Sequence, residues 1–242
     1  MRLSILGAAG KVGRLTVAEA LARGHHVRAL ARTPARIPLT PGPGSLERVA
    51  GDVLDPSAVE RAVAGADAVV CTFGAPLTWE TITREPTICE RGTRTALEAM
   101  ARAGVDRLIC MTAIGLGESR TRGRWVFRSI IRPLLLGRIY ADRERQERLV
   151  RASGVRWSLV RPAELTDAPA GPWRAVDPDD HTGAEPARVP RATVAGFLMH
   201  EAATGEFLGR APILTAGQGP ASIHEDAVTP LRSRDIQERN DR

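Results

Sequence analysis

A glycine-rich turn directly after the first apolar segment constrains the fold most strongly. Residues 2–6, RLSIL, have strand character, and GAAGKVG at 7–13 follows with the spacing G-x-x-G-x-x-G. Residues 12–22 then show the apolar spacing of a helix. Glycines suit such a turn because it adopts backbone angles that side chains forbid and lets a phosphate approach the main chain. The sequence therefore predicts a dinucleotide site at the amino end of this helix, with a purely structural turn as the alternative.

Strand-like and helical segments alternate along most of the chain. Strands are expected at 2–6, 26–31, 47–50, 66–73, 106–112, 156–162 and near Ile213, and helices at 12–22, 57–63, 86–103, much of 124–152 with a break at Pro133, and 193–203. One helix for each crossover indicates a parallel, doubly wound sheet of the Rossmann-like α/β class. The proline- and glycine-rich stretch 33–45 is expected to be a mobile loop.

The length of 242 residues suits one large α/β domain. We expect this domain over residues 1–216, with 166–216 forming a small region on the substrate side. Residues 217–242 are polar and charged, which predicts a flexible tail that could contact a second subunit in a homodimer.

Composition argues against several classes of partner. The net charge is +6, but the basic residues are dispersed among acids, which indicates a solvated surface rather than a nucleic-acid stripe. Arginines interrupt the apolar run 125–138, so we expect a packing helix and no membrane span, with a membrane-surface helix as the alternative. Cys71, Cys89 and Cys110 lack metal-ligand spacing, and Cys71 and Cys110 lie in apolar runs and are expected to be reduced core residues. The sequence thus predicts a cytoplasmic protein without a metal or signal peptide, whose partner is a small molecule.

The end of the second strand indicates which dinucleotide is bound. Proteins that prefer NAD place an acid there for the ribose 2′-hydroxyl, whereas a basic residue accommodates a 2′-phosphate. No acid occurs between Glu19 and Glu47, and the strand is followed by Arg32, with Lys11 and Arg14 in or beside the turn. We therefore predict NADP(H) as the cofactor, against the alternative that these residues are ordinary solvated surface.

Further cofactor contacts are expected where later strands end. In GDVLDP, Asp52 and Val53 are placed to meet the adenine, whereas Asp55 is the better candidate for capping the next helix. The ends of the fourth and fifth strands should line the crevice of the sheet. The predicted cofactor-binding residues are Gly7, Ala9, Gly10, Lys11, Val12, Gly13, Arg32, Asp52, Val53, Thr72, Phe73, Gly74, Met111, Thr112 and Pro162.

Five stretches within residues 1–165, namely GAAGKVG, GDVLDPSAV, AGADAVV, AGVDRLICMTA and ERLVRASGVRWSLVRP, resemble the atypical short-chain dehydrogenase/reductases. The chain is most similar to the NAD(P)H-binding group that contains NmrA-like proteins and the biliverdin/flavin reductases. The resemblance implies a Rossmann-like sheet, NADPH at the glycine turn and a flat substrate near the nicotinamide. The flavin reductases carry a serine after the threonine of their fifth strand, whereas this chain has Ala113.

The catalytic pair of many such reductases, Tyr-x-x-x-Lys, is absent. Tyr140 is the only tyrosine, the fourth residue after it is Glu144, and the only lysine, Lys11, belongs to the glycine turn. A phenol stays protonated at neutral pH and can still donate a hydrogen bond. The predicted catalytic residues are therefore Tyr140, Thr112 and Ser119.

Four polar residues that follow Tyr140 have a structural interpretation that is simpler than a catalytic role. Asp142 with Gln146, and Arg143 with Glu147, are expected to form i,i+4 pairs on an exposed helix face. Proton donation by Asp142 or Glu147 is the alternative.

Hydride transfer is chemistry that the cofactor carries, and conjugated acceptors spread the incoming charge over a ring system. We therefore expect an NADPH-dependent reductase of a flavin, a quinone or a related conjugated carbonyl compound. A non-catalytic NADP(H)-binding redox sensor is the alternative, followed by a natural-product isomerase or ketoreductase.

Overall fold

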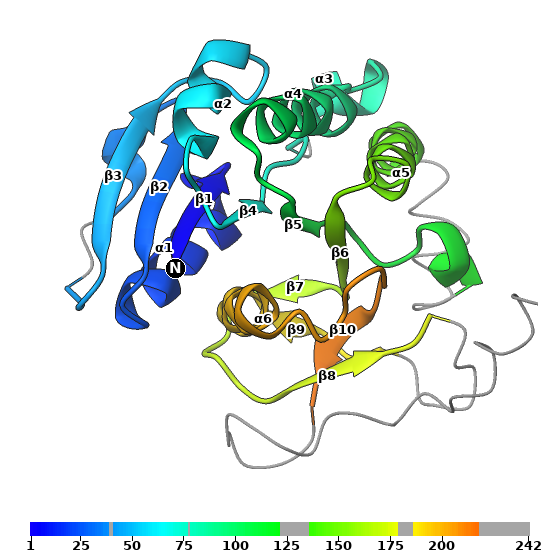
Figure 1. Ribbon diagram of the computed structural model, residues 1–242. Coiled ribbons are helices and arrows are strands. Elements are labelled where there is room, and N and C mark those ends of the chain that lie inside the picture. The colour runs from blue at the N-terminus through cyan, green and yellow to red at the C-terminus, as the bar shows by residue number, and fades with distance from the viewer. Residues whose placement is uncertain (39–40, 77, 122–135, 179–185, 218–242) are drawn as a thin grey trace, which may run out of the picture.

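A mostly parallel eight-stranded sheet runs through the computed structural model (Figure 1). The structure describes residues 1–38, 41–76, 78–121, 136–178 and 186–217, and structural statements below concern these residues. The sheet consists, in spatial order, of β3 (Ser45–Ala50), β2 (His26–Ala31), β1 (Arg2–Leu6), β4 (Ala68–Cys71), β5 (Arg107–Met111), β6 (Arg156–Pro162), β10 (Ile213–Ala216) and β8 (Trp173–Val176). Only β8 in this sheet runs antiparallel to its neighbour.

The strand order reverses beside β1, which positions the functional edge of the sheet. Chain order runs outward from β1 through β2 to β3 on one side, and from β4 through β5 to β6 on the other. β1 pairs in parallel with both β2 and β4, from Leu3 opposite Ala68 to Leu6 opposite Cys71. The predicted doubly wound Rossmann-like fold is confirmed, and its switch point lies where β1 and β4 end.

Helices cover both faces of the sheet, and side chains from each face form a separate apolar cluster. One face carries α1 and α6, which pack against each other, and the other carries α2, α4 and α5 (Figure 1). The helices are α1 (Lys11–Ala22), α2 (Pro56–Val63), α3 (Trp79–Thr83), α4 (Ile88–Ala103), α5 (Gly137–Arg151) and α6 (Arg191–Thr204), with 3₁₀ turns η1 (Pro34–Arg36) and η2 (Gly117–Thr121).

Cys71 and Cys110 lie in the core as expected, and Cys89 is buried as well. Cys71 of β4 is in register with Cys110 of β5, and Cys71, Cys89 and Cys110 are all buried and unpaired by disulfides. Burial raises the pKa of the Cys89 thiol to about 11. A hydrogen bond with Cys71, followed by burial, raises the pKa of Cys110. The Cys89 and Cys110 thiols therefore stay protonated at neutral pH, and all three cysteines pack as small apolar groups.

Several elements differ from the sequence-based expectation. The helix expected from Pro86 starts at Ile88. It is preceded by α3, which was not predicted. Thr78 and Thr81 form reciprocal capping hydrogen bonds at the first turn of α3. The strands β7 (Leu165–Thr166), β8 and β9 (Val189–Pro190) were also not predicted. They are two to four residues long, so their pairing depends on tertiary neighbours rather than on local pattern.

Some other expectations concern residues that lie partly or wholly outside the described ranges. Within the expected mobile loop 33–45, residues 34–36 form η1. Pro133 and the tail from 218 onward lie outside the described parts. In the described parts no helix is both long and apolar enough to cross a membrane. They also contain no cluster of three or more His, Cys, Asp or Glu side chains that could hold a metal ion.

A buried ion pair joins α6 to the amino-terminal ends of the central strands. Arg107 and Glu201 are 5% and 0% exposed, and their side chains meet at 2.7 Å. Glu201 also accepts hydrogen bonds from the Ser158 hydroxyl and the Phe207 amide. Burial lowers the pKa of Arg107, and the charge of Glu201 opposes this. The pair therefore fixes how α6 docks on the sheet.

We expect Glu201→Gln to lower the free energy of unfolding by about 3 kcal/mol, because it leaves a buried guanidinium without its counter-charge. Urea denaturation measures this loss. The control is Glu19→Gln, which removes a half-exposed i,i+4 pair with Arg23 and should change stability by less than about 0.5 kcal/mol. Equal losses of unfolding free energy in the two variants would show that burial of the Arg107–Glu201 pair does not increase its contribution to stability.

Candidate cofactor and active site

The glycine turn closes tightly over the ends of β1 and β4. Gly7 has φ +84°, and a Cβ there would lie 2.7 Å from the Phe73 amide nitrogen. A Cβ on Gly13 would overlap the Gly7 carbonyl oxygen and lie 2.9 Å from Thr72 Oγ1. The Gly7 and Ala8 amides both donate to the Leu30 carbonyl. Gly7 and Gly13 are thus required by the fold, because side chains would force β1, β4 and α1 apart.

The amino end of α1 is open to an anion. Gly10 is the N-cap residue, it offers no side chain to the first amides, and no acid lies in the first turn. The nearest atom to a Cβ added at Gly10 would be the Gly7 carbonyl oxygen, at 3.2 Å, and nothing else lies within 4 Å. Unsatisfied amides and the helix dipole favour a phosphate at such an end. The turn therefore fits the pyrophosphate of a dinucleotide.

The basic residues expected to recognise a 2′-phosphate lie around this turn. The side chain of Arg32, directly after β2, is 77% exposed, and its Nε lies 3.9 Å from Asp52 Oδ2. Asp52 Oδ1 accepts the Leu54 amide at 3.0 Å, which holds the carboxylate beside Arg32. Lys11 reaches Asp167, 3.7 Å away, and both side chains are exposed. Arg32 is thus available to an anion on the β2 side of the turn.

Asp55 caps α2 as predicted, with Oδ1 3.0 Å from the Ser57 amide and Pro56 as the first helical residue. The hydrogen bond from the Ser57 hydroxyl lowers the pKa of Asp55.

Most of the remaining predicted cofactor contacts lie at the carboxyl ends of β4, β5 and β6, whereas Val53 lies between β3 and α2, and most of them are buried. Thr72 donates to the Leu6 carbonyl, and Phe73 packs with Val53 against Gly92 of α4. Thr72, Phe73, Val53, Met111 and Thr112 are each 4 to 7% exposed. Side chains buried to this extent could meet a ligand only through their small exposed areas and through neighbouring main-chain atoms.

Each predicted catalytic hydroxyl makes a hydrogen bond to a protein acceptor. The Tyr140 hydroxyl donates to the Ile114 carbonyl at 3.0 Å, and the Ser119 hydroxyl donates to the Leu116 carbonyl at 2.7 Å. Ser119 Oγ also accepts the Gly115 and Leu116 amides. Thr112 donates to Glu147 Oε1 at 2.7 Å. In this state the three hydroxyl groups hold the segment after β5, and none directs its proton to a substrate.

The expectation that four α5 residues form pairs on an exposed face was wrong. Asp142, Gln146 and Glu147 are 0%, 0% and 4% exposed. Asp142 accepts the Cys89 and Glu90 amides and thereby caps α4, and Gln146 donates to Thr93. A helix periodicity shows which residues share a face, but it does not show that a polar face is buried when another helix supplies matching groups.

Glu147 is paired with Arg161 of β6 rather than with Arg143. Arg161 is fully buried, and its Nε and Nη2 lie 3.0 and 2.5 Å from the two Glu147 oxygens. Burial opposes the charge of Arg161, but hydrogen bonds and charge from Glu147 and Glu118 together raise its pKa. The carboxylate oxygens of Glu147 are occupied as acceptors, which argues against the proton-donor alternative.

Arg143 is a residue of this edge that sequence reasoning did not assign to the site. Its Nη1 donates to the Met111 carbonyl at 2.7 Å and to Gln146 at 3.2 Å. A Cβ on Gly74 would overlap its Nη2. The guanidinium therefore lies over the ends of β4 and β5. The only sequence signal was its position one helical turn after Tyr140.

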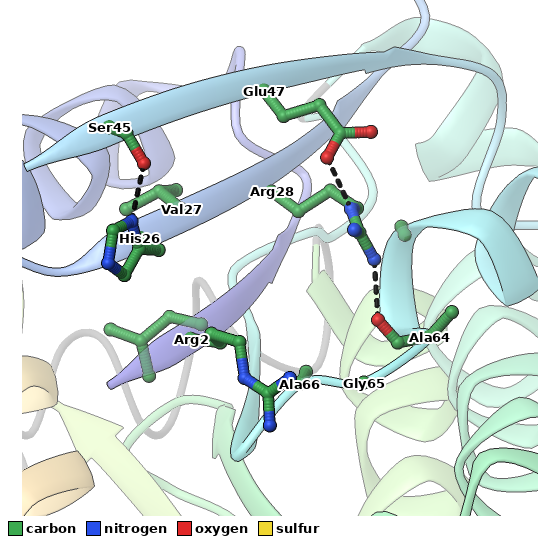
Figure 2. A pocket seen from close by; sticks show the side chains of 11 residues that line it. Arg2, His26, Val27, Arg28, Ser45, Glu47, Ala64, Gly65 and Ala66 are labelled. Carbon is green, nitrogen blue, oxygen red and sulfur yellow. Dashed lines mark hydrogen bonds and ion pairs between the residues drawn. The ribbon is translucent and has the colours of Figure 1, made fainter.

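Two hollows lie away from the glycine turn. The larger, with a volume of about 350 Å³, lies at the amino ends of β1, β2 and β3 and contains Arg2, His26 and Arg28 (Figure 2). The second, about 300 Å³, lies between η2 and α5 and is lined in part by Glu118, Glu147 and Arg161. Ligands of such sheets bind at the carboxyl ends of the strands, so we assign the functional site to the turn rather than to the larger hollow.

Comparison with known proteins agrees with a dinucleotide site at the glycine turn. A family model described as NAD(P)H-binding matches residues 7–204. A 3-beta-hydroxysteroid dehydrogenase of Mycolicibacterium neoaurum is 34% identical over 45% of this chain and 31% of its own length. A (4-alkanoyl-5-oxo-2,5-dihydrofuran-3-yl)methyl phosphate reductase of Streptomyces griseus is 34% identical over 65% of this chain and 46% of its own length. The matches thus span less than half the length of these two relatives.

Solved structures share the fold at lower sequence identity. The anaerobillin reductase ChuY of Escherichia coli O157:H7 superposes with a TM-score of 0.71 at 22% identity, covering 92% of this chain and 100% of that one. A short-chain dehydrogenase/reductase of Veillonella parvula in complex with NADP gives a TM-score of 0.71 at 18% identity, covering 91% and 96%.

We expect Gly10→Ala to weaken NADP(H) binding by about tenfold, because the new methyl group narrows the approach of a phosphate to the first amides of α1. Calorimetric titration measures the change. The methyl group would lie 3.2 Å from the Gly7 carbonyl oxygen, a tight contact with one backbone atom at the N-cap, so a small fall in melting temperature is expected. Unchanged affinity in a folded variant would place the phosphates elsewhere.

Proposed function

Because the chain belongs to the NAD(P)H-binding protein family, we propose that it is an NADPH-dependent reductase of a flavin, a quinone or a related conjugated carbonyl compound. The observation that carries this proposal is the open amino end of α1, bounded by three glycines and flanked by the exposed Arg32.

In this proposal the residues of the turn bind and orient the cofactor. Gly7, Gly10 and Gly13 let the pyrophosphate approach the first amides of α1. Arg32 contributes charge and paired donors for the 2′-phosphate, with Lys11 beside it. Asp52 accepts from the adenine amino group. Ala9, Val12, Val53, Thr72, Phe73, Gly74, Met111, Thr112 and Pro162 are proposed to complete the walls and floor of the site.

The bound cofactor supplies hydride, and the protein holds it against the acceptor. An isolated ketone needs a proton donor as its alkoxide forms, whereas a conjugated acceptor spreads the charge and can take its proton from solvent. The hydroxyls of Tyr140, Thr112 and Ser119 make hydrogen bonds within the protein, which favours the conjugated acceptor. The similarity to a reductase named for an oxo-dihydrofuran phosphate supports a carbonyl compound of this kind.

The same engaged hydroxyls also favour a second candidate, an NADP(H)-binding sensor without turnover. Incubation with NADPH and a panel of flavins, quinones and simple ketones separates the two functions. Loss of the NADPH absorbance with conjugated acceptors and little loss with simple ketones is expected for the reductase. Tight NADP(H) binding without turnover of any acceptor would support the sensor and contradict the reductase.

We expect Arg32→Glu to weaken NADPH binding by at least about tenfold, because it replaces the cation beside the 2′-phosphate with a like charge. NADH binding should change by a much smaller factor, since NADH lacks that phosphate. Fluorescence titration with both cofactors measures the two affinities. Arg102→Gln is the control, because this exposed arginine pairs with Glu60 of α2 away from the turn. Parallel losses for NADH and NADPH would argue against a 2′-phosphate contact.

We expect Tyr140→Phe to keep kcat for a conjugated acceptor within about threefold of the wild-type value, because the phenol proton is directed to the Ile114 carbonyl. Steady-state rates with a quinone measure this. A loss of a hundredfold or more, in a variant with an unchanged melting temperature, would instead make Tyr140 the catalytic acid.

A further inference from the structure

Arg143 lies over the carboxyl ends of β4 and β5 through a contact that requires a glycine. The guanidinium is held by the Met111 carbonyl, and Nη2 takes the space where a side chain on residue 74 would begin. Gly74 is not among the glycines with positive φ, so its backbone angles would also suit alanine. Gly74 therefore provides room, and Arg143 fills it from α5.

Arg143 makes no ion pair with any residue in the described parts of the chain. Within these ranges its Nε and Nη2 make no hydrogen bond and are not buried unpaired atoms. The side chain is half-buried, and these two donors have no acceptor among the described residues. By contrast Arg145, two residues on, lies 2.5 Å from Glu85 and 2.7 Å from Glu90. Arg143 is thus a fixed cation whose free donors point away from protein acceptors.

The position of Arg143 relative to the turn indicates which half of a dinucleotide it would meet. A dinucleotide in this class of sheet lies across the switch point, with one nucleotide on each side. Arg32 and Asp52 lie on the β2 and β3 side, which suits the adenosine half. Arg143 lies at the ends of β4 and β5, on the opposite side. The nicotinamide half would therefore lie beside the guanidinium.

The two redox forms of the cofactor differ in charge at that ring, because oxidised nicotinamide is a cation and reduced nicotinamide is neutral. A fixed cation nearby repels the oxidised ring and leaves the reduced one unaffected. We propose that Arg143 makes this site bind NADPH more tightly than NADP⁺. The inference rests on the proposed cofactor site at the glycine turn, but it does not require turnover. In a reductase the same repulsion speeds the exchange of spent cofactor, and in a sensor it reports the redox state.

Calorimetric titration of the wild type, Arg143→Gln and Arg143→Lys with NADPH, NADP⁺ and adenosine 2′,5′-bisphosphate tests the proposal. The wild type should bind NADPH about tenfold or more tightly than NADP⁺. Arg143→Gln should reduce this ratio to near one, mainly by tightening NADP⁺, and Arg143→Lys should keep most of it. Adenosine 2′,5′-bisphosphate, which lacks the nicotinamide, should bind all three proteins equally. Arg145→Gln removes a paired cation from the same helix and should leave the ratio unchanged.

The outcomes separate this inference from the proposed function. If the bisphosphate does not bind the wild type, the proposed cofactor site itself is wrong. If it binds, but the wild type shows no preference for NADPH or Arg143→Gln retains the full preference, the role of Arg143 is overturned and the cofactor site stands. If Arg143→Gln does not fold, the wild-type ratio decides, together with its decline as salt rises, which is expected for a charge open to solvent.

Discussion

The contact between Gly7 and the backbone of Phe73 is the constraint on which the functional edge depends. β1 and β4 end side by side at the switch point, and the chain leaves β1 through a residue with φ +84° whose missing side chain lets the two backbones meet. A side chain at Gly7 would move the end of β4, and with it Phe73, which packs against α4. The positions of the first turn of α1 and of the residues after β4 therefore depend on this one close contact between two backbones.

A polar layer beneath α5 is the second organising feature of the site. Asp142 caps α4, Gln146 reaches Thr93, and Glu147 joins Arg161 to Thr112. Buried polar groups of this kind are tolerated because almost every donor has an acceptor. Arg161 Nη1 is the exception on this helix–strand interface within the described chain.

The polar layer also limits the chemistry that the site can perform. It engages Thr112, and the neighbouring Tyr140 and Ser119 hydroxyls are engaged by main-chain carbonyls. Among the described residues, the groups open to a ligand include the α1 amides, Lys11, Arg32 and the Arg143 guanidinium. In the proposed function, such a site would hold an anionic dinucleotide and influence it by charge rather than by proton transfer, which suits acceptors that stabilise their own negative charge.

The sequence by itself determined the strand–turn–helix unit, the parallel order of elements and the absence of a Tyr-x-x-x-Lys pair. Those features are local or compositional, because the demand of a turn for glycine and the alternation of apolar segments are written in neighbouring residues. Only the tertiary structure decided what the polar residues of α5 do, because their partners lie far along the chain. Thr112 and Glu147 are 35 residues apart, and Asp142 meets the Cys89 amide across 53 residues. Whether a charged helix face meets water or a neighbouring helix is settled by packing, and that packing also brought Arg143 to the edge of the crevice.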